Sequence, residues 1–287
     1  MFNKNFLINI YKIISKFYVF LFSRKKMQFL NNIIFSLSLD AKGFKNYGNF
    51  SKTGEKSFIK IIKNEISLSL DIGANIGKYT KLLLTESKTK VIAFEPMSGS
   101  FKKLEEVKLD FKDRLEIHNF ALGNENTKKK IFYENENSEK ASLIDSLDKL
   151  SFIDNKKKNT KIIDVKKLDS LENLFENQII DFIKIDTEGY EFEVLTGAKN
   201  ILSKHQPKYI QIEFNWHQLI RNQTLYKLSS LINFSDVFRI LPNENGLIHI
   251  DPTRPENNIY HLSNYVFIRK DISNKYKWKK LKQLLLC

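Results

Sequence analysis

SLSLDIGANIGKY, residues 67–79, decides the fold of this chain. Alternating Ser and Leu predict a strand, and the glycine-rich turn after Asp71 leads into a helical pattern that begins at Lys78. A strand, a glycine turn and a helix in this order form the nucleotide-binding corner of a doubly wound sheet. The carboxylate of Asp71 at the strand end would repel phosphate oxygens, so the corner favours a ligand with hydroxyls or a positive centre.

A second acid follows at the distance that such a corner predicts. Residues 90–96, KVIAFEP, form a buried strand that ends in Glu95, about twenty residues after the turn. The ends of the first two strands lie side by side in a doubly wound sheet, so Glu95 can accept hydrogen bonds from two ribose hydroxyls. The structural alternative is a helix-capping carboxylate, although Ser98 and Ser100 are equally able caps.

Two later strands also end in polar residues. Residues 181–189, DFIKIDTEG, carry Asp186 at their exit, and a fifth strand over residues 209–217, YIQIEFNWH, ends with Glu213, Asn215 and His217. Ligands of open α/β sheets bind outside the carboxyl ends of the strands. We therefore expect one crevice to collect four side chains, namely Asp71, Glu95, Asp186 and His217.

Several segments together resemble the FkbM-type S-adenosylmethionine-dependent methyltransferases over roughly residues 43–269. They are DIGANIGKYT, AFEP, NFALG, LDSL, IDFIKIDTEGYEFEVLTGA and IQIEFN, and the later WHQL and SNYVFIRK resemble a subset found with bacterial surface-polysaccharide genes. The resemblance implies a class I methyltransferase fold (α/β, Rossmann-like), with a seven-stranded sheet whose last strand is antiparallel. It also implies O-methyl transfer, often to a sugar hydroxyl. Thr187 stands where the family usually has Val.

The resemblance implies a role for each candidate site residue. The cofactor is S-adenosyl-L-methionine, with Gly73, Asn75 and Gly77 in the turn that its methionine part approaches, and Asp71 near its amino group, directly or through water. Glu95 would hold the ribose, and Asn119, Phe120 and Ala121 would lie near the adenine. Asp186 is the first candidate for the catalytic base. His217 is the second, against the alternative that it only hydrogen-bonds in the loop beside Trp216.

The chain divides into three parts in this interpretation. Residues 1–54 form an N-terminal helical extension, 55–270 the methyltransferase domain with an insertion or lid over 124–161, and 271–287 a basic tail. Apolar residues at helical spacing over 6–35, with lysines among them, predict one basic amphipathic helix. That helix could dock against protein, as a cover of the sheet or an oligomer contact, or lie on an anionic membrane surface.

The amino-acid composition excludes fewer functions than the motifs do. The net charge of +14 suits an anionic partner, but Lys is abundant throughout, as a biased genome composition would also produce. The single cysteine, Cys287, excludes an internal disulfide framework and a multi-cysteine metal cluster. We expect a cytoplasmic protein, with inner-membrane contact as one placement of the helix. Asp186, Glu188 and Glu213 could hold a divalent metal, but no metal is predicted because their spacing is not a specific signature.

Other functions remain open at this stage. A nicotinamide dehydrogenase needs a GxGxxG turn, which ANIG does not supply. An RNA methyltransferase would explain the charge, although no RNA-binding signature is present. A small-metabolite methyltransferase and an inactive membrane-surface scaffold are further alternatives. We expect a glycan or nucleotide-sugar acceptor and no nucleic acid.

Overall fold

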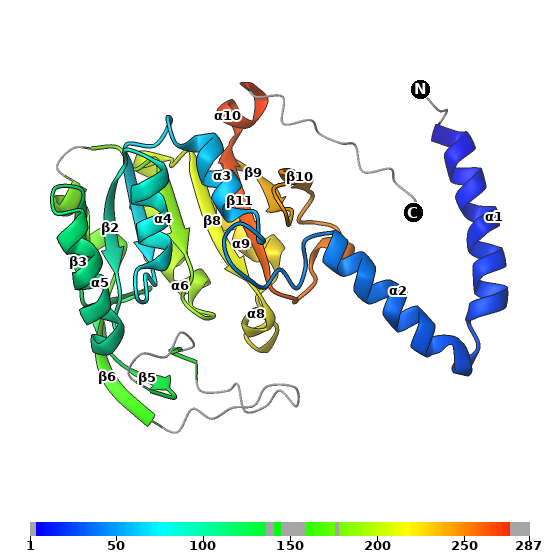
Figure 1. Ribbon diagram of the computed structural model, residues 1–287, viewed down its shortest axis with the longest axis horizontal. Coiled ribbons are helices and arrows are strands. Elements are labelled where there is room, and N and C mark those ends of the chain that lie inside the picture. The colour runs from blue at the N-terminus through cyan, green and yellow to red at the C-terminus, as the bar shows by residue number, and fades with distance from the viewer. Residues whose placement is uncertain (1–3, 136–140, 145–158, 176–177, 276–287) are drawn as a thin grey trace.

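A central sheet of eight strands organises the protein, which is described here from a computed structural model over residues 4–135, 141–144, 159–175 and 178–275 (Figure 1). From one edge to the other the strands are β10 (Leu247–Ile250), β9 (Ser235–Ile240), β11 (Ser263–Arg269), β8 (Tyr209–Phe214), β7 (Phe182–Ile185), β1 (Leu68–Ile72), β2 (Lys90–Phe94) and β3 (Leu115–His118). The predicted nucleotide-binding strand, β1, lies near the middle, with β2 and β7 as its parallel neighbours.

The sheet is mostly parallel, with the antiparallel strands at one end. The last strand, β11, is antiparallel to both β8 and β9, as the resemblance implied. The expectation of seven strands was wrong, because β10 pairs antiparallel with β9 and adds an eighth. The turn over residues 242–246 joins β9 to β10, so the extra edge strand arises from a hairpin.

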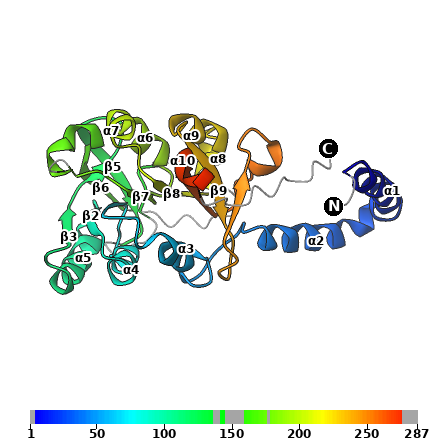
Figure 2. The same cartoon turned by 90° about the horizontal axis from the view of Figure 1, so that it is seen from above.

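Helices cover both faces of the sheet (Figure 2). One face carries α3 (Glu55–Ile62), α4 (Lys78–Glu86) and α5 (Ser98–Asp110), packed on a core that includes Phe58, Leu83 and Leu104. The other face carries η3 (Leu168–Phe175), α6 (Glu191–Thr196), α7 (Lys199–His205) and α9 (Leu225–Leu231). Because helices cover both faces, every residue of β1 and β7 is buried, including the polar Ser69, Asp71 and Lys184. Further short helices are α8 (Trp216–Ile220), η4 (Pro255–Asn257) and α10 (Lys270–Lys275).

A second, three-stranded sheet contains the described ends of the 124–161 segment. β6 (Asn159–Lys166) pairs antiparallel with β5 (Thr127–Tyr133) and parallel with β4 (Ala121–Leu122). β6 therefore belongs to this small sheet and not to the central one. Residues 115–122 are divided between the two sheets, with β3 in the central sheet and β4 in the small one.

The N-terminal extension consists of two helices, α1 (Lys4–Phe22) and α2 (Gln28–Ala41), where one was expected. The break falls at the basic cluster, where Arg24 has an extended backbone and the short η1 (Lys25–Met27) follows. The side chains of Asn31 and Gln28 donate to the carbonyls of Phe22 and Ser23, which a continuous helix would have used. Both helices project away from the sheet (Figures 1 and 2).

The structure also revises the end of the fifth expected strand. The strand expected to reach His217 ends at Phe214, because the Asn215 side chain caps α8 and the Asn215 backbone N–H donates to the Gln218 side chain. The basic tail expected over 271–287 lies, apart from residues 271–275, outside the described residues.

The glycine turn after β1 leads to a stability prediction. Gly73 has φ +82°, and a Cβ there would lie 1.9 Å from the carbonyl oxygen of Asp186. We expect Gly73→Ala to lower the free energy of unfolding by about 3–5 kcal/mol, from backbone strain and a backbone clash. Urea denaturation would measure the loss.

Gly246→Ala is the matched control for this substitution. Gly246 has a similar φ of +86°, but nothing lies within 4 Å of a Cβ at that position. Gly246→Ala should therefore lower the free energy of unfolding by only about 1–2 kcal/mol, from backbone strain alone. Equal losses for the two variants would contradict the role assigned to the close approach at Gly73.

Candidate active site

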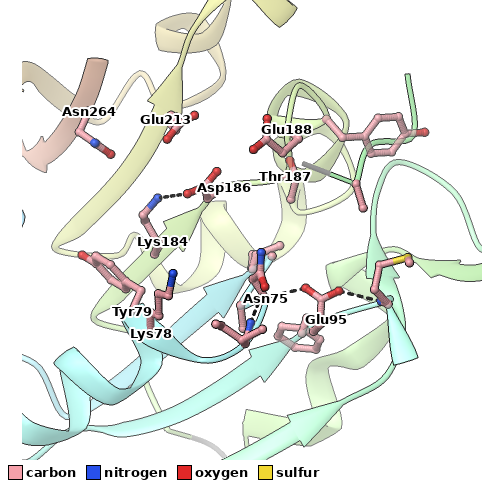
Figure 3. Close-up of a pocket in the computed structure, with 18 of the residues that line it drawn as sticks. Asn75, Lys78, Tyr79, Glu95, Lys184, Asp186, Thr187, Glu188, Glu213 and Asn264 are labelled. Atoms are coloured by element: carbon pink, nitrogen blue, oxygen red, sulfur yellow. Dashed lines mark hydrogen bonds and ion pairs between the residues drawn. The ribbon is translucent and has the colours of Figure 1, made fainter. Parts of the chain in front are cut away.

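A cavity of about 640 Å³ lies beyond the carboxyl ends of β1, β2, β7 and β8 (Figure 3). This is where a doubly wound sheet binds its ligand, and the volume suits a cofactor-sized molecule. The cavity has an acidic and amide-rich part and an apolar part. The first includes Asn46, Glu55, Glu95, Lys184, Asp186, Glu188, Glu213 and Asn264, and the second includes Phe94, Met97, Ala121, Ile131, Ala141 and Leu143.

The glycine turn lines this cavity and is connected to β2. The backbone N–H groups of Gly73 and Ala74 both donate to the carbonyl of Phe94 at 3.0 Å. Gly77, with φ +79°, begins α4 and lies against α5, where a Cβ would come within 2.8 Å of Leu104. Gly73 lines the cavity, whereas Gly77 acts through packing between α4 and α5.

Glu95 lies at the cavity wall in a hydrogen-bonded and almost fully buried position. One carboxylate oxygen accepts from the N–H of Asn75 at 2.8 Å and the other from the N–H of Met97 at 2.7 Å. Burial raises the pKa of Glu95 to about 7, although these two hydrogen bonds oppose the increase. Asn75 itself adopts φ +50° and lines the cavity beside it. The carboxylate is therefore held in a fixed orientation by the turn that it faces.

Asp71 does not line the cavity. Its carboxylate is 1% exposed and accepts a hydrogen bond from the Thr80 hydroxyl at 2.5 Å, in the first turn of α4. Burial raises its pKa to about 6, and the Thr80 hydrogen bond opposes that shift. The structure therefore does not bring Asp71 into the crevice, and its visible role is to attach α4 to the end of β1.

Lys184 and Asp186 form a buried ion pair at the end of β7. The Lys184 Nζ lies 2.9 Å from the Asp186 carboxylate, and Figure 3 shows the pair pointing into the cavity. Burial alone would lower the pKa of Lys184, but the carboxylates of Asp186, Glu55 and Glu213 outweigh burial and raise it. The lysine thus stays charged and holds Asp186 in place.

Glu213 also lines the cavity, although the sequence suggested only a role as a metal ligand for it. Ile185 of β7 lies beside Ile212 of β8, so the residues that follow them, Asp186 and Glu213, are neighbours at the cavity. Asn264 of β11 pairs with Glu213 on its other side. Burial, then the charges of Asp186 and Glu188, raise the pKa of Glu213 well above its usual value. The parallel register of two charged strand exits is the signal that could have identified it.

His217 does not reach the cavity. It is 3% exposed, in α8, with its Nδ1 2.6 Å from the Asn215 side-chain oxygen and 3.6 Å from the Glu188 carboxylate. Its Cβ lies 2.6 Å from the position a Cβ would take at Gly189. Of the four side chains expected to share one crevice, Glu95 and Asp186 line the cavity, whereas His217 and Asp71 do not.

Of the three residues expected near an adenine, only Ala121 lines the cavity. The Asn119 amide donates to the backbone carbonyl of Glu95 at 2.8 Å, and thereby supports the loop that carries that carboxylate. The Phe120 ring packs against Phe94, with centroids 5.6 Å apart, and lies 4.2 Å below the Lys166 Nζ. Asn119 and Phe120 support the cavity wall from behind.

One part of the wall, formed by residues 46–50, was not expected from the sequence, whereas Ala141 and Leu143 belong to the 124–161 segment expected as an insertion or lid. Residues 46–50, between α2 and α3, line one side of the cavity. On another side lie Ala141 and Leu143, and the Ser142 hydroxyl between them donates to the Glu188 carbonyl at 2.7 Å. Loops distant in sequence carry no local signal of a shared cavity, so only the folded chain reveals this contribution.

A metal centre is not evident in the described part of the chain. There, no group of three or more His, Cys, Asp or Glu side chains has an arrangement that could hold a metal ion. This includes the set Asp186, Glu188 and Glu213, of which Asp186 and Glu213 act on the buried ammonium group of Lys184.

The fold and the cavity together define the class of protein. A parallel sheet ordered around β1, an antiparallel β11 between β8 and β9, and a glycine turn facing a buried acid describe a class I methyltransferase, which uses S-adenosylmethionine. Residues 71–245 match the family model of the methyltransferase FkbM domain. The chain therefore belongs to the FkbM methyltransferase family. No curated protein sequence matches it.

Solved methyltransferase structures resemble the chain at low identity. Methyltransferase FkbM from Methylobacillus flagellatus KT is 19% identical, with a TM-score of 0.43 over 71% of this chain, which spans only 44% of that protein. An O-methyltransferase from Bacillus cereus, in complex with SAH, is 12% identical over 91% of this chain and all of that one, with a TM-score of 0.40. An rRNA methylase from Streptococcus thermophilus is 11% identical over 75% and 93% of the two chains, with a TM-score of 0.37.

The cavity fits the cofactor that the family implies. A buried carboxylate, Glu95, is available to ribose hydroxyls, and the apolar part formed by Phe94, Met97 and Leu143 next to it suits an adenine ring. The acidic part suits the positive sulfonium and amino groups.

The raised pKa of Glu95 leads to a pH prediction. With its pKa at about 7 in the free protein, against 4.5 ordinarily, Glu95 binds more protons folded than unfolded. The stabilising effect of that proton is complete below about pH 4.5 and is lost as the pH rises through about 7. Ribose hydroxyls donate to the ionised form, so cofactor affinity should rise about tenfold between about pH 6 and pH 8.

Titration calorimetry with S-adenosylmethionine tests this directly. Glu95→Gln should bind more weakly and lose most of the pH dependence. Asp71→Asn is the matched control, since that carboxyl is also buried with a raised pKa but does not line the cavity. An unchanged pH dependence in Glu95→Gln would show that another group binds the ribose.

Proposed function

We propose that this protein transfers a methyl group from S-adenosylmethionine to a sugar hydroxyl during the synthesis of a bacterial surface polysaccharide. The observation that carries the proposal is the row formed by Asp186, Glu213 and Asn264 across β7, β8 and β11, in the same cavity as Glu95. Carboxylates and amides are the groups that bind sugar hydroxyls by hydrogen bonds. The acceptor would be a glycan or a nucleotide-sugar.

The charge of this row favours a neutral hydroxylic acceptor over RNA. Three carboxyl groups, those of Asp186, Glu188 and Glu213, line the acceptor part, and Lys184 is already paired with Asp186. An RNA strand would bring its phosphates toward these acids, which would repel them. Lys78 also lines the cavity, so the lining includes two lysines, Lys78 and Lys184, against the five acids Glu55, Glu95, Asp186, Glu188 and Glu213.

The residues of the cavity support the following chemistry. When bound, the cofactor would supply an activated methyl group on its sulfonium. Asp186 would orient the acceptor hydroxyl and accept its proton as the oxygen reacts, while the Lys184 ammonium, 2.9 Å away, holds that carboxylate in its orientation. Glu213, beside Asp186 in the same cavity, would form a hydrogen bond with a neighbouring hydroxyl of the acceptor.

Cellular placement is part of the same proposal. None of the described helices is long and apolar enough to cross a membrane. We place the enzyme in the cytoplasm, where a nucleotide-sugar or a growing glycan would be its acceptor, with peripheral contact at the inner membrane. An oligomeric form is compatible with this placement.

Mass spectrometry of surface glycans from cells with and without the protein tests the acceptor class. The proposal expects one additional methyl group per modified sugar when the protein is present. Unchanged glycans, together with the loss of a methyl group from RNA or from a small metabolite, would overturn it.

Asp186 can be tested in the same cells. Asp186→Ala should reduce glycan methylation about 100-fold or more, because the proton acceptor is lost. Its affinity for S-adenosylmethionine should stay within about twofold, measured by calorimetry on the purified variant. Glu95→Ala should do the reverse and weaken cofactor binding first. If Asp186→Ala abolished cofactor binding, Asp186 would be reassigned to the cofactor.

A further inference from the structure

The two N-terminal helices, α1 and α2, carry a large exposed apolar surface that the proposed reaction does not use. In the described part of the chain, sixteen of the twenty-three exposed large apolar side chains belong to these two helices. Phe17, Phe20 and Phe29 are 65%, 70% and 77% exposed. Exposed apolar surface on this scale marks an interaction site.

Each helix arranges these side chains on a broad stripe. In α1, Asn9, Lys12 and Lys16 follow one another at helical spacing and form a narrow polar face opposite the apolar residues. In α2, apolar residues recur at the spacing of one face over Phe29–Leu37. The bend between them is held by the Tyr18 hydroxyl, which donates to the Asn31 side chain at 2.6 Å.

The charges next to this surface have a single sign. Residues 1–39 contain no Asp or Glu, and they carry Lys12, Lys16 and the cluster Arg24, Lys25 and Lys26 at the bend. Cations next to aromatic and aliphatic side chains match a surface of anionic lipid headgroups above acyl chains.

The same charges argue against a second copy of the chain as the occupant. A symmetric contact would bring the two basic clusters toward each other with no acid before Asp40 to neutralise them. No described helix can span a bilayer, so the surface suits a helix pair that lies on the membrane.

The surface is firmly joined to the domain. Leu39 near the end of α2 is buried, the Arg239 side chain donates to the Lys42 carbonyl at 2.7 Å, and its guanidinium lies 3.9 Å above the Phe44 ring. The chain then runs on into residues 46–50, which line the cavity. Whatever binds α1 and α2 is therefore attached to the domain that contains the active site, through the segment that lines the cavity.

We propose that α1 and α2 bind the surface of an anionic membrane and thereby hold the cavity beside it. This proposal does not depend on the identity of the acceptor.

Vesicle co-sedimentation of the full chain tests the proposal. The probes are vesicles of phosphatidylcholine alone and vesicles that also contain phosphatidylglycerol. We expect binding to the anionic vesicles to be at least about tenfold stronger than to the neutral ones, and to weaken as salt is added. Absence of binding to both, or equal binding to both, would overturn the proposal.

Two variants locate the binding surface. Phe17→Ser/Phe20→Ser/Phe29→Ser should weaken binding to anionic vesicles about tenfold or more. Arg24→Gln/Lys25→Gln/Lys26→Gln should reduce the preference for anionic lipid. The matched control, Leu109→Ser/Ile162→Ser/Tyr226→Ser, removes three exposed apolar side chains elsewhere and should bind like the wild type.

Thermal melting and cofactor affinity should be the same for all these proteins, because the altered side chains are exposed. Equal losses in the Phe variant and its control would overturn the proposal. So would a wild-type dimer, detected by light scattering, that binds no vesicles and that the Phe substitutions dissociate, since the occupant would then be a second copy.

Discussion

The active site depends on the ion pairing of one buried lysine, Lys184, with the acids around it. The Lys184 ammonium group lies among the carboxylates of Asp186, Glu55 and Glu213, and 5.4 Å from the centroid of the Tyr79 ring. Buried acids at this density would repel one another and lose their charge without a cation between them. Gln211 extends the network, donating to Glu55 and Asn264 and accepting from the Tyr79 hydroxyl. Charge balance at one lysine thus connects α3, α4, β7, β8 and β11.

The close approach of β1 and β7 gives the cavity its two functional parts. Without a side chain at Gly73, the end of β1 lies against the Asp186 carbonyl. On one side, the turn faces Glu95 and the apolar wall, which suits a nucleoside. On the other, the row that begins at Asp186 suits hydroxyls. The reacting atoms of donor and acceptor would meet at the junction of these strands, which is the arrangement that a direct transfer between two bound molecules needs.

Prediction from sequence succeeded where local pattern and sheet topology agree. Alternation and apolar runs located β1, β2 and β7, and the carboxyl ends of parallel strands lie at one edge, so Glu95 and Asp186 reach the cavity. It failed where a competing local interaction decided the outcome. The Asn215 cap ended β8 and turned His217 into α8, the Thr80 hydroxyl holds Asp71 away from the cavity, and the basic cluster at Arg24 divided the expected helix.

The sequence by itself determined the family, the doubly wound fold and two of the acids in the cavity, because those depend on short-range periodicity and on motifs that one segment contains. Only the tertiary structure decided that Glu213 stands beside Asp186, that residues 46–50 form a wall of the cavity, and that β10 adds an eighth strand. These features depend on register and on contacts between segments distant in the chain. They are set when the whole core packs, and no single stretch of sequence specifies them.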